Sequence, residues 1–367
     1  MTPIAKKIPI LLLAISFIIQ REITSVEINT PILALIAWGF IVLNKGKIIK
    51  KDLELLSLLV AIIGVGVVSA VFNEQSAYNF FRDLVYFTKP LILILLGYFA
   101  AKSINNWRVI FKLIINLGVL YATYHIFHTI IYTDFENATA STIRRANGLS
   151  NVIEIFAIAL IILGKKTPSL SVLTKKRIEF LFLTLLLVSF VLYFSRTLIV
   201  GLVFLILGVL NYLKLNKKGI KYCAILLFLV VGLYAHLYNT EYNRTGSAIE
   251  SFLYKLKIAP SEIFSPKLDI NNKKELWDHW RAYEAFCALE DLDKSTINYV
   301  SGKGFGSLVD LKFDAPVSNE GLLRYIPILH NGYVLLLYKT GVLGLLLYLV
   351  FLFYLYYQAY QKTKAYK

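Results

Sequence analysis

Charged residues are scarce in this chain of 367 residues, where they make up 17% of the sequence. A soluble domain of average composition carries about 25%. The sequence is also 57% hydrophobic with a mean hydropathy of +0.63. Its apolar blocks are too long for buried strands or ordinary core helices. These features exclude an ordinary soluble protein and predict an all-α polytopic membrane protein.

Cysteine and acidic residues are few as well. The two cysteines, Cys223 and Cys287, are expected on opposite sides of the membrane, which excludes a disulfide between them. The 23 acidic residues face 39 basic ones, giving a net charge of +16. In a soluble protein this excess would indicate a nucleic-acid binder. Here the basic residues lie mainly in short loops between apolar blocks, so they report orientation in the membrane, and no nucleic-acid partner is expected.

Apolar blocks of membrane-crossing length predict about ten spans. The first block follows Lys6 and Lys7 like a signal peptide, but no small-residue cleavage site comes after it, so we interpret it as a retained helix. The predicted spans cover residues 8–20, 30–44, 53–72, 88–101, 109–131, 151–164, 178–194, 197–213, 222–238 and 331–357.

Strongly basic loops alternate with loops that carry fewer Lys and Arg. Because basic loops stay in the cytoplasm, both termini are predicted to be cytoplasmic. The polar stretch 239–329 then lies outside and is long enough to need structure of its own, including an amphipathic helix with Trp277, Trp280 and Phe286 on its apolar stripe. The predicted division is nine spans in 1–238, an outer domain in 239–329, and a last span with a cytoplasmic tail in 330–367.

Arg196 lies between two apolar runs with almost no polar loop. A charge at mid-membrane costs about 2.5 kcal/mol or more, so its side chain should face a cavity or head groups. Two interpretations stay open: a guanidinium that binds a lipid phosphate, or an interfacial anchor. Arg144 and Arg145 open a turn into a predicted helix. They allow the same phosphate interpretation, beside that of solvated loop charges.

His330 stands where the polar outer stretch meets the last apolar run, in the sequence His330-Asn331-Gly332-Tyr333. A helix N-terminus opposes positive charge and favours the neutral imidazole, which can accept a proton. Asn331 is the expected cap of that helix. The alternative is that His330 has only an interfacial, capping role.

Three other patterns carry less weight. His125 and His128 share a helix face and would supply two metal ligands, but no Cys or carboxylate cluster completes a site, so polar helix packing is expected. The glycine-rich run 301–306 lacks the context of a nucleotide loop, and close backbone packing or a tight turn is expected instead. Two outer carboxylates would make a glycosidase-like pair, drawn from Glu275, Asp278, Glu284, Glu290, Asp291, Asp293, Asp310, Asp314 and Glu320.

Together these motifs resemble, in order and content, the O-antigen ligase/polymerase family of bacterial inner membranes. An Arg-Arg-Ala-Asn-Gly-Leu-Ser-Asn segment starts at Arg144, and a Phe-Ser-Arg-Thr hairpin carries Arg196. The outer stretch holds Trp-Arg-Ala-Tyr-Glu-Ala from Trp280 and Gly-Lys-Gly-Phe-Gly from Gly302. His-Asn-Gly-Tyr follows at His330, with Lys-Thr-Gly-Val-Leu-Gly in the last apolar run.

The resemblance implies a GT-C-like glycosyltransferase of the bacterial inner membrane. Members move glycan from an undecaprenyl-diphosphate carrier to an acceptor sugar at the outer leaflet, and they need neither nucleotide sugar nor metal, so no cofactor is expected. Polymerases extend another carrier-linked repeat, whereas ligases attach the chain to lipid A core. A polymerase is the first expectation here. A flippase or transporter would predict inverted repeats and polar mid-span residues, which the sequence lacks.

Residue by residue, the resemblance gives His330 the activation or positioning of the acceptor. It gives Arg196 and Arg281 the binding of the diphosphate. The other implied substrate-binding residues are Arg144, Arg145, Asn331 and Tyr333.

Overall fold

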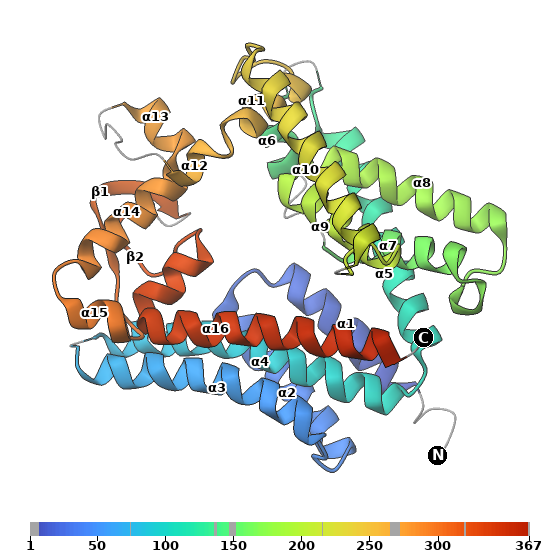
Figure 1. Ribbon diagram of the computed structural model, residues 1–367, viewed down its shortest axis with the longest axis horizontal. Helices are drawn as coiled ribbons and strands as arrows, with labels where there is room; N and C mark the ends of the chain where they lie inside the picture. The colour runs from blue at the N-terminus through green and yellow to red at the C-terminus, as the bar shows by residue number, and fades with distance from the viewer. Residues whose placement is uncertain are drawn as a thin grey trace. The chain divides into compact units, whose positions relative to one another are not determined.

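The chain folds into two compact units (Figure 1). The structure is a computed structural model, and it describes residues 7–73, 75–135, 138–146, 152–214, 216–264, 272–318 and 321–365. The first unit joins both ends of the sequence, Met1–Ser103 and Pro260–Lys367, and the second is the middle of the chain, Ile104–Ala259. Each unit has a hydrophobic core of its own.

The first unit combines long apolar helices with a small polar part. Its elements are α1 (Ile8–Glu22), α2 (Val26–Leu43), α3 (Lys50–Val71), α4 (Ala77–Ile104), α12 (Ser261–Phe264), α13 (Lys273–Asp278), α14 (Trp280–Leu292), α15 (Thr296–Ser301), β1 (Val309–Ser318), β2 (Gly321–Ile326) and α16 (Gly332–Ala365).

All the regular elements among the described residues of the second unit are helices. Its core lies between α5, α7, α8 and α9. Its elements are α5 (Trp107–Tyr132), α6 (Ala140–Ala146), α7 (Val152–Lys166), the single 3-10 turn η1 (Pro168–Leu170), α8 (Lys176–Leu192), α9 (Arg196–Val209), α10 (Lys217–Tyr238) and α11 (Ala248–Ile258).

Long apolar helices make this a multi-pass membrane protein. Among the described residues, six helices have the length and hydropathy to cross a bilayer: α2, α3, α4, α5, α10 and α16. Large apolar side chains on their outward faces, such as Trp38, Phe81 and Phe228, are more than half exposed. Exposing such faces to water costs about 25 cal/mol per Å², a cost that surrounding lipid removes.

The ten predicted spans each lie on a described helix, but four of those helices are short. α1, α7, α8 and α9 have 15, 15, 17 and 14 residues. A helix rises about 1.5 Å per residue, so these fall below the roughly 20 residues that cross a ~30 Å hydrocarbon core. The count of ten spans, the cytoplasmic termini and the outer placement of residues 239–329 therefore stay predictions.

The sequence predicted a single span over residues 331–357. In the structure the last apolar stretch is not one straight helix. Gly341 adopts φ 64° and ψ −170° and divides α16 into a short arm, residues 332–340, and a long arm, residues 342–365. The rings of Tyr333 and Tyr348 are 6.1 Å apart, whereas fifteen residues of straight helix would separate them by about 22 Å. The two arms are therefore folded back on each other. Figure 1 shows the long arm in red beside α3 and α4.

The glycine-rich run 301–306 packs against this kink. Lys303 N donates to Tyr338 O at 2.8 Å and Gly304 N to Lys339 O at 3.1 Å. A Cβ on Gly304 would lie 2.3 Å from the backbone nitrogen of Ala70, and one on Gly341 would lie 2.2 Å from Val300 O. Only glycine permits both the positive φ and this approach. The expectation of close backbone packing for this run is confirmed.

A buried ion pair joins the kink to α4. Lys339 Nζ lies 2.5 Å from Asp83 Oδ2, and both side chains are almost fully buried. Lys339 also donates to the carbonyl of Ser307, and Asp83 accepts from Gly306 N at 2.7 Å. Each buried ion loses several kcal/mol of solvation. These additional hydrogen bonds are what such a pair needs to be stable.

The predicted amphipathic helix is two helices, α13 and α14, which meet at His279. Trp280 is buried, whereas Trp277 and Phe286 are exposed, so the predicted apolar stripe does not form one buried face. Tyr283 and Cys287 lie with Trp280 in the core. A β-hairpin, β1 paired antiparallel with β2, packs against α14. This hairpin was not predicted, although apolar and charged residues alternate from 309 to 314 with the period of a half-buried strand.

Breaking the Lys339–Asp83 pair should destabilise the first unit. Lys339→Met leaves the Asp83 carboxylate buried without a counter-charge, so we expect the free energy of unfolding to fall by about 3–5 kcal/mol. The double variant Asp83→Leu/Lys339→Met removes both charges and should lose less than Lys339→Met alone. Denaturant unfolding of the purified protein measures both, with the exposed Lys51→Met as control. Wild-type stability in Lys339→Met would contradict the role of the pair.

Candidate functional site

His330 is held by a buried carboxylate just before α16 begins. Its Nδ1 lies 3.0 and 2.9 Å from the two carboxylate oxygens of Glu284. Its backbone N–H donates to the same carboxylate at 3.0 Å. The Glu284 side chain is 3% exposed, whereas the imidazole is 58% exposed. The buried acid therefore fixes a histidine whose ring is open to solvent.

Glu284 is itself positioned by α14. Trp280, one turn earlier on this helix, donates its indole N–H to Glu284 Oε1 at 2.6 Å. The carboxylate thus accepts N–H groups from Trp280 and from both the ring and the backbone of His330. A buried carboxylate needs such donors because its solvation is lost. Glu284 is one of the nine outer carboxylates and lies in the Trp-Arg-Ala-Tyr-Glu-Ala motif, but no role of its own was predicted for it.

The hydrogen bond that the His330 ring donates to Glu284 raises the pKa of His330 above its ordinary 6.5. Partial burial opposes the shift, the negative charge of Glu284 adds to it, and the positive charge of Arg281 lowers it. The expectation that the helix N-terminus would dominate and favour the neutral ring is therefore wrong. With Nδ1–H directed to Glu284, the neutral ring presents Nε2 as a proton acceptor, the arrangement of a carboxylate-oriented general base.

Asn331 and Tyr333 follow His330 at the start of the short arm. The Asn331 side chain accepts from the backbone N–H of Tyr333 at 3.1 Å and of Val334 at 3.3 Å. This contact confirms Asn331 as the helix cap. Tyr333 is exposed and lines a cavity.

The cavity has a volume of about 420 Å³ and lies between α3, α4 and the two arms of α16. Its walls are apolar and aromatic, with tyrosine hydroxyls as the polar exceptions. Gly332, two residues after His330, is part of the lining. The lining residues are Leu59, Ile62, Tyr86, Phe87, Pro90, Ile94, Gly332, Tyr333, Leu335, Leu336, Tyr348 and Phe351.

Arg281 shares α14 with Glu284 and acts on His330 electrostatically. Its guanidinium is half exposed and lies 3.8 Å from the Glu262 carboxylate. An exposed ion pair at this distance contributes little stability. The structure therefore brings Arg281, Glu284 and His330 together in one unit, with the arginine accessible to an anion.

The other predicted arginines belong to the second unit. Arg196 Nη1 donates to Lys255 O at 2.6 Å, near the C-terminus of α11. Ser195 caps α9 through the backbone N–H of Leu198. The helix α6, which carries Arg144, also packs against α11. The side chain of Arg145 and the residues from Asn147 to Asn151 lie outside the described residues.

A buried polar network lies just before the Arg196 turn; the polar packing of His125 in it was expected, but the part played by Glu154 was not. Ser189 Oγ donates to Glu154 Oε2 at 2.6 Å, and Tyr193 OH donates to Glu154 Oε1 at 2.9 Å. The imidazole Nδ1 of His125 lies 2.8 Å from Ser189 Oγ, and its ring stacks on Tyr193 at 3.9 Å. The network joins α5, α7 and α8. Its member Tyr193 precedes Arg196 by only three residues. The network therefore positions the turn that carries Arg196.

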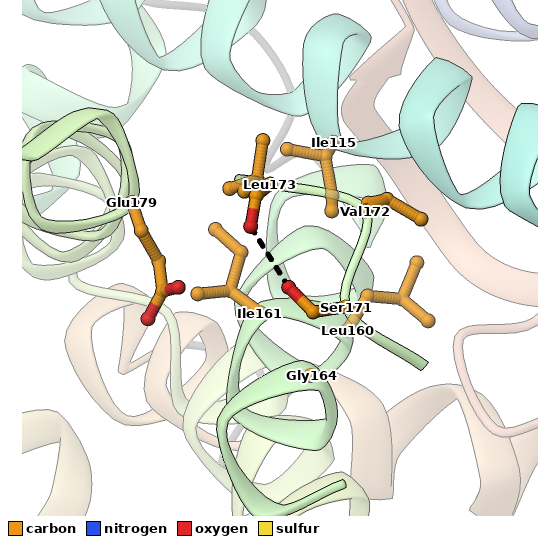
Figure 2. A pocket seen from close by; sticks show the side chains of 8 residues that line it. All are labelled: Ile115, Leu160, Ile161, Gly164, Ser171, Val172, Leu173 and Glu179. Carbon is orange, nitrogen blue, oxygen red and sulfur yellow. Dashed lines mark hydrogen bonds between the residues drawn. The ribbon is translucent and has the colours of Figure 1, made fainter. Parts of the chain in front are cut away.

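A hollow in the second unit is too small to be a ligand site. Figure 2 shows it between α5, α7 and the segment after η1, with the Ser171 hydroxyl directed to the carbonyl of Leu173 at 2.9 Å. Its volume is about 10 Å³, about the smallest that holds a water molecule. The Glu179 carboxylate at its edge is occupied by Lys165 at 3.3 Å.

The part of the chain that the structure describes contains no candidate metal site. No three His, Cys, Asp or Glu side chains come together there in a group that could hold an ion. Comparisons of the chain with protein-family models, with curated proteins and with solved structures found no match.

Glu284→Gln should lower the pKa of His330. The amide still accepts a hydrogen bond but carries no charge, so the imidazolium loses its stabilisation. Because the folded-state pKa is raised, the pair stabilises the fold fully below pH 6.5, and this contribution disappears as pH rises through the folded-state pKa. Histidine NMR titration of the full chain, with His330→Ala to assign the signal, measures the shift. An unchanged or higher pKa in Glu284→Gln would contradict the pairing.

Glu154→Ala should destabilise the second unit. It leaves the hydroxyls of Ser189 and Tyr193 buried without their acceptor, and each such group costs about 1–3 kcal/mol. Thermal unfolding of the purified protein measures the loss, and the exposed Glu241→Ala is the matched control. Equal melting of the two variants would show that the network is dispensable.

Proposed function

We propose that the protein is a membrane glycosyltransferase that moves glycan from an undecaprenyl-diphosphate carrier to an acceptor sugar. The observation that carries the proposal is the exposed imidazole of His330, oriented by buried Glu284 beside an apolar cavity in a membrane protein. A base held where polar chain meets lipid suits a hydroxyl acceptor and a lipid-borne donor. The resemblance of the motifs to the O-antigen ligase/polymerase family supports the same reaction.

The chemistry is a displacement at the anomeric carbon of the donor sugar. The acceptor oxygen forms a bond to that carbon, and its proton passes to Nε2 of His330. The bond from the carbon to the phosphate oxygen breaks, and the electron pair leaves with the lipid diphosphate. Attack opposite the leaving group inverts the anomeric centre. The step needs no metal, nucleotide or other co-reactant.

Arg281 is the arginine best placed to act near His330. A positive charge that already acts on the imidazole also acts on a leaving group bound beside it, and a preorganised guanidinium stabilises developing phosphate charge. It further limits the pKa rise that Glu284 causes, which keeps more of the imidazole neutral. Arg196 with Arg144 or Arg145 are proposed diphosphate ligands as well. The contact of Arg196 with Lys255 favours an anchoring role for one edge of its guanidinium.

The same reaction serves two biological roles. As a polymerase the enzyme extends a carrier-linked repeat, and as a ligase it attaches the glycan to lipid A core. We propose a polymerase of the bacterial inner membrane with both termini cytoplasmic. The glycan profile of a deletion strain separates the two roles, because single repeats on core indicate a lost polymerase and polymer on the carrier indicates a lost ligase.

Replacement of His330 should abolish glycan transfer. Loss of a general base lowers the rate by about 10²- to 10⁴-fold, so we expect a fall of this size in His330→Ala, and strong losses in Arg196→Ala and Arg281→Ala. Transfer is measured with the full chain in proteoliposomes that contain a carrier-linked repeat. His236→Ala, an exposed histidine on α10, is the control.

The pH profile of transfer distinguishes a base from a structural histidine. Activity should rise with pH as His330 loses its proton, and Glu284→Gln should move this rise to lower pH. Wild-type transfer by His330→Ala at matched protein levels would overturn the catalytic assignment. Unchanged surface glycans in the deletion strain would overturn the function itself.

A further inference from the structure

Arg82 on α4 carries hydrogen-bond donors that no described residue uses. Its side chain is 15% exposed, and its Nε and Nη2 are buried with no hydrogen-bond partner among the described residues. Asp83 Oδ1 lies 3.9 Å from Nε, beyond hydrogen-bonding distance. The guanidinium also lies over the ring of Tyr78, 5.7 Å from its centroid. Buried donors of this kind are rare in folded proteins and call for an acceptor.

The surrounding charges leave Arg82 as a surplus cation. Lys339 and Arg82 supply two positive charges, and Asp83 supplies one negative charge. Oδ2 of Asp83 is occupied by Lys339 and by the backbone N–H of Gly306. A buried cluster with net positive charge is costly, and a bound anion removes that cost.

The buried edge of Arg82 is the edge that binds oxyanions. Elsewhere in the same unit, Arg324 uses this edge on a carboxylate, with Nε 2.9 Å from Asp310 Oδ1 and Nη2 3.1 Å from Asp310 Oδ2. Two parallel N–H groups match two oxygens of a carboxylate or a phosphate. Arg82 therefore has the geometry of an oxyanion ligand.

The position of Arg82 selects the kind of anion. Tyr86, one helical turn or about 6 Å further along α4, lines the apolar cavity, and so do Phe87, Pro90 and Ile94. A cation at one end of a helix face and an apolar hollow along it together suit an amphiphile with a phosphate head and a hydrocarbon chain.

We propose that Arg82 binds a phosphate of a polyprenyl diphosphate whose chain lies in the cavity between α3, α4 and the two arms of α16. The identity of this lipid rests on the proposed function. Positive charge at Arg82 complements the diphosphate, and the aromatic walls around Tyr333 and Tyr348 contact the chain.

Lipid binding by the full chain tests the proposal. The protein is placed in nanodiscs of phosphatidylcholine and titrated with a fluorescent polyprenyl diphosphate. Arg82→Gln removes the charge and the two parallel N–H donors of the guanidinium. We expect it to weaken binding of the lipid by about 10- to 100-fold. Arg324→Gln, which loses a guanidinium already paired with Asp310, should bind as the wild type does. Leu336→Trp, which fills the cavity, should also weaken binding of the lipid.

Equal affinity of Arg82→Gln and the wild type would overturn the proposal. Competition by inorganic diphosphate or by phosphatidylglycerol as strong as that by the polyprenyl diphosphate would overturn it too, because the site would then select neither chain nor head. If Arg82→Gln does not fold, Arg82→Lys takes its place, and wild-type affinity there would count against the two-pronged contact. Arg82-dependent binding without glycan transfer would support this site and contradict the proposed function.

Discussion

A lysine inside the last apolar stretch has to find a counter-charge, because an unpaired ammonium is too costly to bury. Lys339 finds Asp83 on α4 and the carbonyl of Ser307. This requirement brings the glycine-rich run to the kink and holds Gly341 in a conformation that ends the short arm. The ion pair therefore decides where the short arm points and, with it, where His330 stands.

The polar part of the first unit is built on that short arm. Tyr338 packs into the core of α14 and the hairpin, and its hydroxyl lies 2.7 Å from the Asp291 carboxylate. α14 is thereby fixed next to the start of α16, which brings Glu284 to the ring and backbone of His330. The site is thus a consequence of packing between the kinked helix and α14.

Sequence patterns predicted those features that depend on neighbouring residues. Apolar blocks located the helices, Asn331 was recognised as a cap, and the glycine-rich run was expected to pack closely. The kink at Gly341, the Lys339–Asp83 pair and the Glu284–His330 contact were missed because each depends on residues far apart in the chain. Glu284 lies in the Trp-Arg-Ala-Tyr-Glu-Ala motif, but only the fold shows that its carboxylate holds His330.

Two opposing local effects set the pKa of His330. A helix N-terminus disfavours the charged ring by about 0.3–1 kcal/mol, whereas a hydrogen bond to an ionised group is worth about 1.5–3 kcal/mol. The hydrogen bond to the nearer carboxylate of Glu284 therefore outweighs the effect of the helix N-terminus. The same contact makes the ring a stronger base and reduces the fraction that is free to act at low pH. Arg281 limits the rise in the pKa of His330, because its positive charge opposes protonation of the ring.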